Sequence, residues 1–197
     1  MTSNSSRHLV RTWALVSLLS LGWLANAQAV VLDFESLPLN SVVSNQFSGV
    51  VFSSPGNPTQ PVINTFSGNS TTGQVLADFS IVGGLQLDAN FTAPVTSVFS
   101  LVYANPQFAV TARAYDAANT LLGTVSSAGG AYNQGVLGFS GVGLISKVTW
   151  VTGSATAAVG IDDLRFSPAV PEPGVWGMLT AAALILPVIK RRRQSAV

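Results

Sequence analysis

Between its two ends, the chain never sustains the spacing of apolar side chains that marks an amphipathic helix. Short runs rich in Val, Phe, Thr and Leu alternate instead with clusters of Gly, Asn, Ser and Pro, a pattern typical of strands joined by turns. The pattern predicts an all-β fold, an antiparallel β-sandwich or jelly roll. Its strands are expected at Val30–Glu35, Gly49–Ser53, Val62–Phe66, Val75–Ser80, Leu85–Phe91, Val95–Tyr103, Phe108–Tyr115, Leu121–Ser126, Val136–Phe139, Ile145–Val151 and Val159–Phe166.

Residues 108–126 show the strand pattern most clearly. Alternate residues place one apolar face on this segment, made by Phe108, Val110, Ala112 and Ala114. The turn-forming sequence Asp116-Ala117-Ala118-Asn119 follows and predicts a hairpin into the next strand. Residues 95–103 are apolar on both faces, which suits a central strand of a sandwich.

The N-terminus has the layout of a secretory signal peptide. Basic residues at 7 and 11 precede an apolar run over 12–24, and small residues then lead to Ala27 and Ala29. Cleavage is expected after Ala27 or after Ala29, which assigns residues 1–29 to a signal helix that the general secretion machinery removes. An uncleaved signal anchor is the alternative, but the run is shorter than the about 20 residues that span a bilayer.

The C-terminus holds a second apolar segment, residues 174–189, between a Val-Pro-Glu-Pro motif and a cluster of basic residues. As a helix this segment would be about 24 Å long, marginal for a hydrocarbon core of about 30 Å. The basic cluster is expected to stay in the cytoplasm, which leaves the rest of the chain outside the inner membrane. The segment before this tail, residues 30–169, is predicted to be the passenger domain.

This tail resembles the PEP-CTERM sorting signal of Gram-negative bacteria that make exopolysaccharide. The resemblance covers residues 170–193 and rests on the order of motif, apolar helix and basic cluster at the end of an exported chain. It implies that a membrane-embedded exosortase recognises and processes residues 170–197. A plain tail anchor is the alternative. The residues assigned to this signal are Pro171, Glu172, Pro173, Lys190, Arg191, Arg192 and Arg193.

The composition excludes large classes of function. The chain has no Cys, and its one histidine, His8, lies in the expected leader, so the mature protein can hold neither a Ser-His-Asp triad nor an ordinary zinc site. Residues 30–169 carry three basic against seven acidic residues, a formal net charge of −4. A mildly acidic domain without a basic stripe is not expected to bind nucleic acid.

Motifs in the first and last expected strands resemble the β-sandwich that PEP-CTERM passengers share with some carbohydrate-binding modules. They are Leu32-Asp33-Phe34-Glu35 and Gly160-Ile161-Asp162-Asp163-Leu164-Arg165-Phe166, with Ala114-Tyr115-Asp116-Ala117 between them. Such modules often carry a structural calcium, and the resemblance makes Glu35 and Asp162 or Asp163 its candidate ligands. Oxygen ligands of this kind suit Ca²⁺. The alternative is a surface ion pair from Arg165 to Glu35 or Asp33.

Hydrolysis is not expected, because the domain has a single Glu and no His. Sugar binding needs aromatic platforms, and few amphipathic rings are available. Trp150 is expected to be buried, and the Phe residues are assigned to the core, whereas Tyr115 and Tyr132 are expected at the surface. The sequence thus predicts an exported, non-catalytic component of the cell surface or exopolysaccharide matrix, tethered to the inner membrane before processing. The alternative is a calcium-stabilised carbohydrate-binding module.

Overall fold

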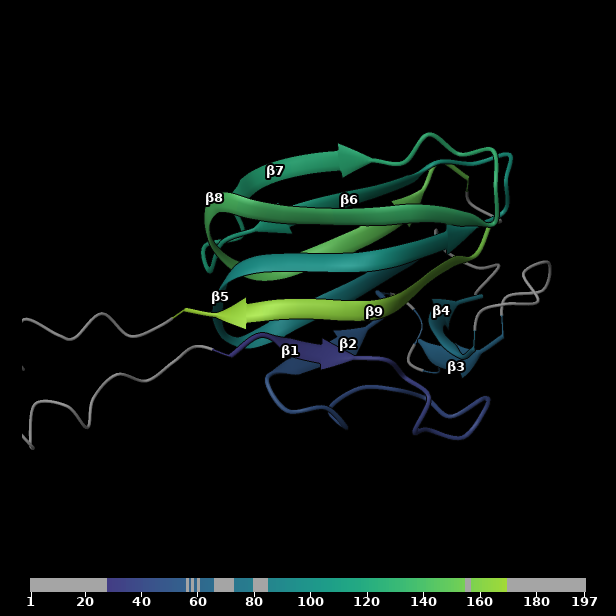
Figure 1. The fold of residues 1–197 in the computed structure, drawn as a ribbon, viewed down its shortest axis with the longest axis horizontal. Coiled ribbons are helices and arrows are strands. Elements are labelled where there is room, and N and C mark those ends of the chain that lie inside the picture. The colour runs from purple at the N-terminus through teal and green to yellow at the C-terminus, as the bar shows by residue number, and fades with distance from the viewer. Residues whose placement is uncertain are drawn as a thin grey trace, which may run out of the picture. The chain divides into compact units, whose positions relative to one another are not determined.

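Nine strands and no helix make up the part of the chain that the computed structural model describes, residues 28–169 without 56, 58, 60, 66–72, 80–84 and 155–156. The strands are β1 (Val30–Leu32), β2 (Val50–Ser53), β3 (Val62–Asn64), β4 (Val75–Asp78), β5 (Gln86–Ala104), β6 (Val110–Tyr115), β7 (Leu121–Ser126), β8 (Asn133–Thr152) and β9 (Val159–Pro168). Every pairing between them is antiparallel, which confirms the predicted fold class (Figure 1).

The predicted signal segment up to residue 27 and the apolar helix 174–189 lie outside the described residues. No helix in the described ranges is long and apolar enough to cross a membrane. The sorting residues, from Pro171 to Arg193, also fall outside these ranges. Ala29, one of the two expected cleavage points, is exposed directly before β1.

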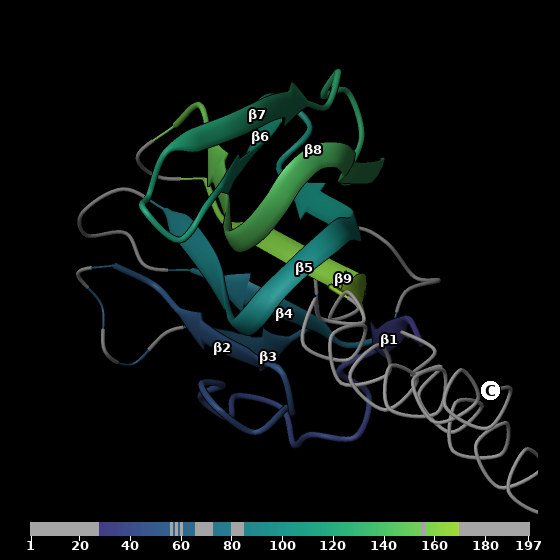
Figure 2. The ribbon, with the colours of Figure 1, turned by 90° about the vertical axis from the view of Figure 1, so that its left-hand side faces the viewer.

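Two long strands, β5 with 19 residues and β8 with 20, build two packed layers. Layer A has the order β2–β5–β8–β6–β7 and uses residues 86–91 of β5 with 147–152 of β8. Layer B has the order β3–β4–β9–β5–β8, with β1 on the same edge of β9 as β4, and uses 95–104 of β5 with 133–145 of β8. Figure 2 shows both long strands bending from one layer to the other.

The long strands correct the sequence analysis, which expected two separate strands in place of each. β5 runs through Pro94, and its register with β8 shifts between Asn90 and Val95. β8 runs through Gly141 and Gly143, which have φ angles of +69° and +113°. Glycine adopts such angles without strain, and β8 resumes its pairing with β5 on both sides of the bend, at Ser140 and at Ile145.

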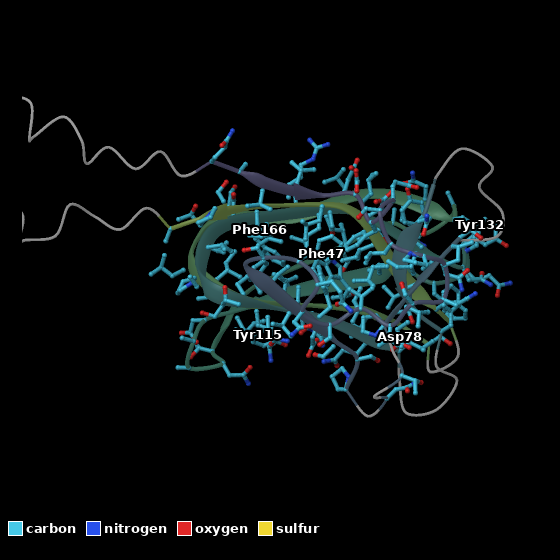
Figure 3. The ribbon with its side chains drawn as sticks, turned by 90° about the horizontal axis from the view of Figure 1, so that it is seen from below. Phe47, Asp78, Tyr115, Tyr132 and Phe166 are labelled. Carbon is cyan, nitrogen blue, oxygen red and sulfur yellow. The ribbon has the colours of Figure 1, made fainter. Side chains whose placement is uncertain are left out.

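The inner faces of the two layers form one apolar core. In layer A, alternate residues Val110, Ala112 and Ala114 are buried, as the pattern of residues 108–115 predicted. The loop after β1 adds Phe34 and Phe47, whose rings pack edge-on against Phe52 of β2. Trp150 is buried in the same core, which confirms its prediction. Phe166 is buried in this core, and the half-buried Phe47 packs against it (Figure 3).

The predicted hairpin between β6 and β7 is present. Asp116 N donates to Thr120 O (3.1 Å), and Asn119 N donates to Asp116 O (3.1 Å). The Asp116 carboxylate also accepts backbone N–H groups of Ala118 (2.9 Å) and Thr120 (2.7 Å). Asn119 has a φ of +61°, a conformation that Asn tolerates better than most residues. The turn is thus closed by its own backbone hydrogen bonds and by the Asp116 side chain.

Candidate functional site

Strands β1 and β9 pair, so the first and last motifs of the domain meet. Val31 lies opposite Arg165, and Leu32 lies opposite Leu164. Asp33 and Glu35 follow β1 directly and therefore come close to the acidic residues in the middle of β9. The pairing of the first and last strands thus brings the acids of the two motifs near one another.

A β-bulge in β9 orients two of the four acids. Phe99 of β5 pairs with Arg165 and Leu101 pairs with Asp162, so β9 has one residue more than β5 over this stretch. Asp163 has a φ of +48° at this point. Ile161 and Leu164 on either side are buried in the core. Asp162 and Asp163 therefore both lie on the outer side of layer B, and β9 changes its edge partner from β4 to β1 here.

The surroundings of Asp162 raise the pKa of its carboxyl group. Burial is the main reason that the pKa of Asp162 rises from 3.8 to about 6, and the charges of Asp163, Glu35 and Asp33 raise it further. The backbone N–H of Asp163 donates to Asp162 Oδ1 (2.7 Å) and opposes this rise. Asp162 is thus protonated more readily than an ordinary aspartate as the pH falls toward about 6.

Glu35 has a structural partner. Its Oε1 accepts the backbone N–H of Gln74 (2.6 Å), just before β4. A Cβ atom on Gly73 would lie 1.6 Å from the same Oε1, so only glycine leaves room for this carboxylate. Among the described residues, no three acidic or histidine side chains form a group that could hold a metal ion. Calcium binding at Glu35, Asp162 and Asp163 stays a prediction from the sequence.

Arg165 forms its ion pair within its own strand. Its Nη2 lies 3.6 Å from Asp163 Oδ2, and both side chains are largely exposed. The predicted ion pair across strands from Arg165 to Glu35 or Asp33 is therefore wrong. Residues two apart on a strand share a face, which brings Asp163 within reach, while Glu35 is held by Gln74. An exposed pair of this kind is worth about 0–1 kcal/mol.

A surface pocket of about 490 Å³ opens on the outer side of layer B next to this ion pair. Its lining residues are Phe99, Ser100, Leu101, Val136, Asp163 and Arg165. We call it the Phe99 pocket. It has an apolar floor from β5 and β8 and a charged wall from β9. Ligand pockets in proteins commonly have volumes of about 300–1,000 Å³.

Phe99 was assigned to the core from sequence, and that assignment is wrong. Its side chain is 38% exposed, and it lies against its cross-strand partner Gly138 of β8. A Cβ atom on Gly138 would come 2.1 Å from Phe99 Cδ1, so the ring occupies the space over the glycine. The only available sequence signal was that residues 95–103 are apolar on both faces, which does not say which face is covered.

The remaining aromatic residues do not form a row. Tyr132 is 36% exposed, as predicted. Tyr115 lies on the outer face of β6 and is half-buried, because the Lys147 Nζ sits 4.6 Å from its ring centroid. Figure 3 shows these two tyrosines far apart. Phe99 is the aromatic ring among the lining residues of the Phe99 pocket.

Comparison with known proteins gives distant likenesses only. No family model and no curated protein match the chain. Among solved structures it is similar to the CBM32 of AlyQ in complex with 4,5-unsaturated mannuronic acid, with 15% identity, 61% of this chain and 95% of that chain covered, and a TM-score of 0.38. It is also similar to a DUF4465 family protein from Bacteroides caccae, with 12% identity, 72% and 100% covered, and a TM-score of 0.39.

A third likeness is to the K2 cleaved adhesin domain of Lys-gingipain, with 11% identity, 71% of this chain and 99% of that chain covered, and a TM-score of 0.38. At TM-scores this low, the likenesses assign neither a family nor a ligand to this chain.

Proposed function

We propose that residues 30–169 form a non-catalytic polysaccharide-binding domain of an exported matrix or cell-surface protein. The observation that carries this proposal is the Phe99 pocket, in which an exposed aromatic ring lies beside an exposed carboxylate–guanidinium pair. A sugar ring has C–H groups on its faces and hydroxyl groups around its rim. A site that binds a sugar therefore needs an apolar surface and hydrogen-bonding groups close together, and the pocket supplies both.

The floor and the wall of the pocket contact different parts of the sugar. The floor formed by Phe99, Leu101 and Val136 packs against the C–H face of the sugar. Arg165 donates hydrogen bonds to hydroxyl oxygens, and Asp163 accepts them from hydroxyl groups. Because Phe99 rests on Gly138 and the two charged groups hold each other, the site is largely formed before a ligand arrives.

The charges around the pocket favour a neutral sugar. Asp33, Glu35 and Asp162 lie close enough to influence one another electrostatically, and they border the same part of β9 as Asp163. Arg165 is the one basic residue among the lining side chains, and Asp163 already neutralises it. A carboxylated or sulfated sugar would meet net repulsion here.

The pocket offers no pair of catalytic carboxyl groups. A glycosidase places two of them on either side of the bond that it cleaves, about 5–9.5 Å apart. Asp163 is the single carboxylate among the lining residues, and it is ion-paired. Asp162 has the raised pKa of an acid catalyst, but it is not among the residues that line the pocket. Binding without hydrolysis is the function that this arrangement supports.

The proposed location of the protein is inferred from the two ends of the chain. The signal sequence up to Ala29 directs export, and an exosortase processes the tail at Pro171, Glu172 and Pro173. Before processing, the helix 174–189 and the basic residues 190–193 hold the protein in the inner membrane. Replacing Glu172 with Ala in the host tests this part, because the unprocessed protein should accumulate in the membrane fraction. Release of E172A to the cell surface at the normal level would overturn it.

The binding proposal is tested by co-sedimentation of the purified 28–169 domain with a panel of insoluble neutral polysaccharides. We expect saturable binding that Phe99→Ala weakens about tenfold or more, since truncation of an aromatic anchor costs at least 1.4 kcal/mol in such sites. Tyr132→Ala is the matched control, because it removes a similarly exposed ring outside the pocket. Equal losses in both variants, or release of soluble sugars by the wild type, would contradict the proposal.

Repeating the sedimentation in EDTA and in millimolar CaCl₂ tests the calcium-stabilised alternative. Binding lost in EDTA and restored by calcium would support that alternative and make Glu35, Asp162 and Asp163 the residues to replace. Binding that is the same in both conditions assigns the affinity to the Phe99 pocket without a metal ion.

A further inference from the structure

The two long strands bend at one end of the sandwich, beside the β6–β7 turn. Tyr115, the last residue of β6, pairs with Lys147 of β8. A Cβ atom on Gly143 would lie 3.8 Å from Leu122 Cδ2, so the bend of β8 also approaches β7. Figure 2 looks onto this end of the domain. We call it the bend end and define it by residues 92–94 of β5, residues 116–121 of the turn and the start of β7, and residues 141–144 of β8.

The chain leaves the described domain at the bend end. Strand β9 ends beside the bend of β5, where Ala169 N donates to Pro94 O (3.1 Å). Only residues 170–173 then separate Ala169 from the apolar segment 174–189. Four fully extended residues span at most about 14 Å. A membrane that holds segment 174–189 is therefore within reach of the bend end.

The surface of the bend end is apolar and open to solvent. Leu121 is 53% exposed and Leu144 is 55% exposed. Their chain neighbours Leu122 and Gly143 approach each other, so the two leucines belong to one surface. The smaller apolar residues exposed in the same segments are Ala93, Pro94, Ala117 and Ala118. Apolar residues gathered in this way mark interaction sites, and membrane surfaces are among the partners that such sites meet.

The charges at the bend end do not oppose contact with lipid. Asp116 is the one charged residue in its three segments, and its carboxylate accepts two backbone N–H groups of its own turn. Lys147 Nζ donates to Asn119 Oδ1 (2.6 Å) in the same turn, which places a cation beside this acid. The ammonium group also lies 4.6 Å from the centroid of the Tyr115 ring. Tyrosine and lysine are common at membrane–water interfaces, because each has an apolar body and a polar tip.

We propose that the bend end docks on the outer surface of the inner membrane while the tail holds the protein there. This inference rests on the proposed function, in which segment 174–189 is inserted in that membrane. Leu121 and Leu144 enter the headgroup region, and Tyr115 and Lys147 lie around them at its edge. Two leucines bury too little area to bind a free domain tightly, but a short tether gives the domain an effective concentration of about millimolar at the surface. Docking keeps the sorting motif that follows Ala169 close to the membrane-embedded exosortase.

The test uses the exported chain, residues 30–197, reconstituted through its tail into vesicles of phosphatidylethanolamine and phosphatidylglycerol. The chain has no cysteine, so Ala117→Cys alone attaches a fluorophore to the bend end and leaves both leucines in place. With iodide on both sides of the bilayer, we expect loss of iodide quenching relative to the same label on the tail-free 28–169 domain, which is one compact unit. Brominated lipids should quench the label instead.

A label at Tyr132→Cys is the matched control for position. Tyr132 is 36% exposed, and Figure 3 places it on the opposite side of the domain from Tyr115. Its label should stay open to iodide and should not respond to brominated lipids. The same vesicles thus report on both ends of the domain.

The double variant Leu121→Ser/Leu144→Ser shows whether the leucines carry the docking. Both side chains are more than half exposed, so the variant should keep the urea midpoint of its parent. It should restore iodide quenching at position 117 while the protein still floats with the vesicles. Leu39→Ser/Val42→Ser is the matched control, because it removes two exposed apolar side chains from the loop that pairs with β3 and should leave the label shielded.

The other outcomes separate the docking from the tether on which it rests. A protein that does not float with the vesicles has no tether, and the inference then fails together with the proposed membrane attachment. A protein that floats while its label at position 117 stays open to iodide keeps the tether and overturns the docking alone. Shielding without quenching by brominated lipids would overturn docking on lipid in favour of contact with a second copy of the chain. Shielding that persists in the double leucine variant would also overturn it.

Discussion

Phe99 of β5 lies over the backbone of Gly138 of β8, with its Cδ1 atom 2.1 Å from the place where a Cβ atom on that glycine would stand. The ring and the glycine are thus complementary across the two strands. The glycine provides a flat support, and the ring covers backbone that would otherwise face water. This contact sets the position of the ring in the Phe99 pocket.

Gly138→Ala should displace the Phe99 ring. We expect the unfolding free energy to fall by about 1–3 kcal/mol, as for other overpacked sites, and binding of neutral polysaccharide to weaken. In a Phe99→Ala background the added methyl group has room, and alanine is intrinsically better than glycine in a strand, so the same change should be neutral or stabilising. Urea unfolding of the four proteins measures this coupling. Additive effects would show that the ring does not rest on Gly138.

Gly73→Ala should destabilise the start of β4. The new methyl group would occupy the space of the Glu35 carboxylate, break its bond to Gln74 N and cost about 1–3 kcal/mol. Gly153→Ala is the matched control, since nothing lies within 4 Å of its Cβ position. It should change the unfolding free energy by no more than about 0.5 kcal/mol. Similar results for both glycines in thermal unfolding would count against the role of Glu35.

Asp162 makes stability depend on pH between about 4 and 6. Its pKa is higher in the folded state, about 6 against 3.8, so the folded protein binds the proton more tightly in this window. The unfolding free energy should therefore fall as pH rises through it, by about 1 kcal/mol once solvent screening of this half-buried group is allowed for. Urea unfolding at pH 4 and 7 measures the difference. Asp162→Asn should flatten the profile and raise stability at pH 7, and an unchanged slope would refute the assignment.

Trp150 is buried, and its Nε1 has no hydrogen-bond partner among the described residues. Trp150→Ala should cost about 3–5 kcal/mol, the usual loss for a large core ring. Trp150→Phe should cost less than about 2 kcal/mol, because the loss of packing is partly offset by removal of the unpartnered donor. Chemical unfolding followed by far-UV circular dichroism compares them. If Phe were as damaging as Ala, the indole N–H would have to be contributing a bond of its own.

The prediction of elements from sequence succeeded where local patterns decide. The β6–β7 hairpin follows from alternation up to Tyr115 and from the turn-forming Asp116 and Asn119. The acids around Asp162 come together because β1 pairs with β9, which the sequence analysis did not establish. Strand ends were less predictable, because Pro94 and Gly141 look like breakers but stand at bends inside β5 and β8.

Alternation along a strand shows which residues share a face, but not whether another layer covers that face. Phe99 was assigned to the core for this reason, whereas its side chain is 38% exposed. The partner of Arg165 was missed because the bulge at Asp163 and the bond from Gln74 to Glu35 both depend on distant segments.

By itself, the sequence determined the β class of this protein, the apolar face of residues 108–115, the main hairpin and the lack of histidine and cysteine chemistry in residues 30–169. These features depend on residue type and on neighbours along the chain. The tertiary structure alone decided that Phe99 meets Gly138 and that Arg113 joins Thr149 and Asp88 in one row. Both depend on strand register, which pairs residues far apart in sequence, and a shift of one residue would turn each side chain to the opposite face.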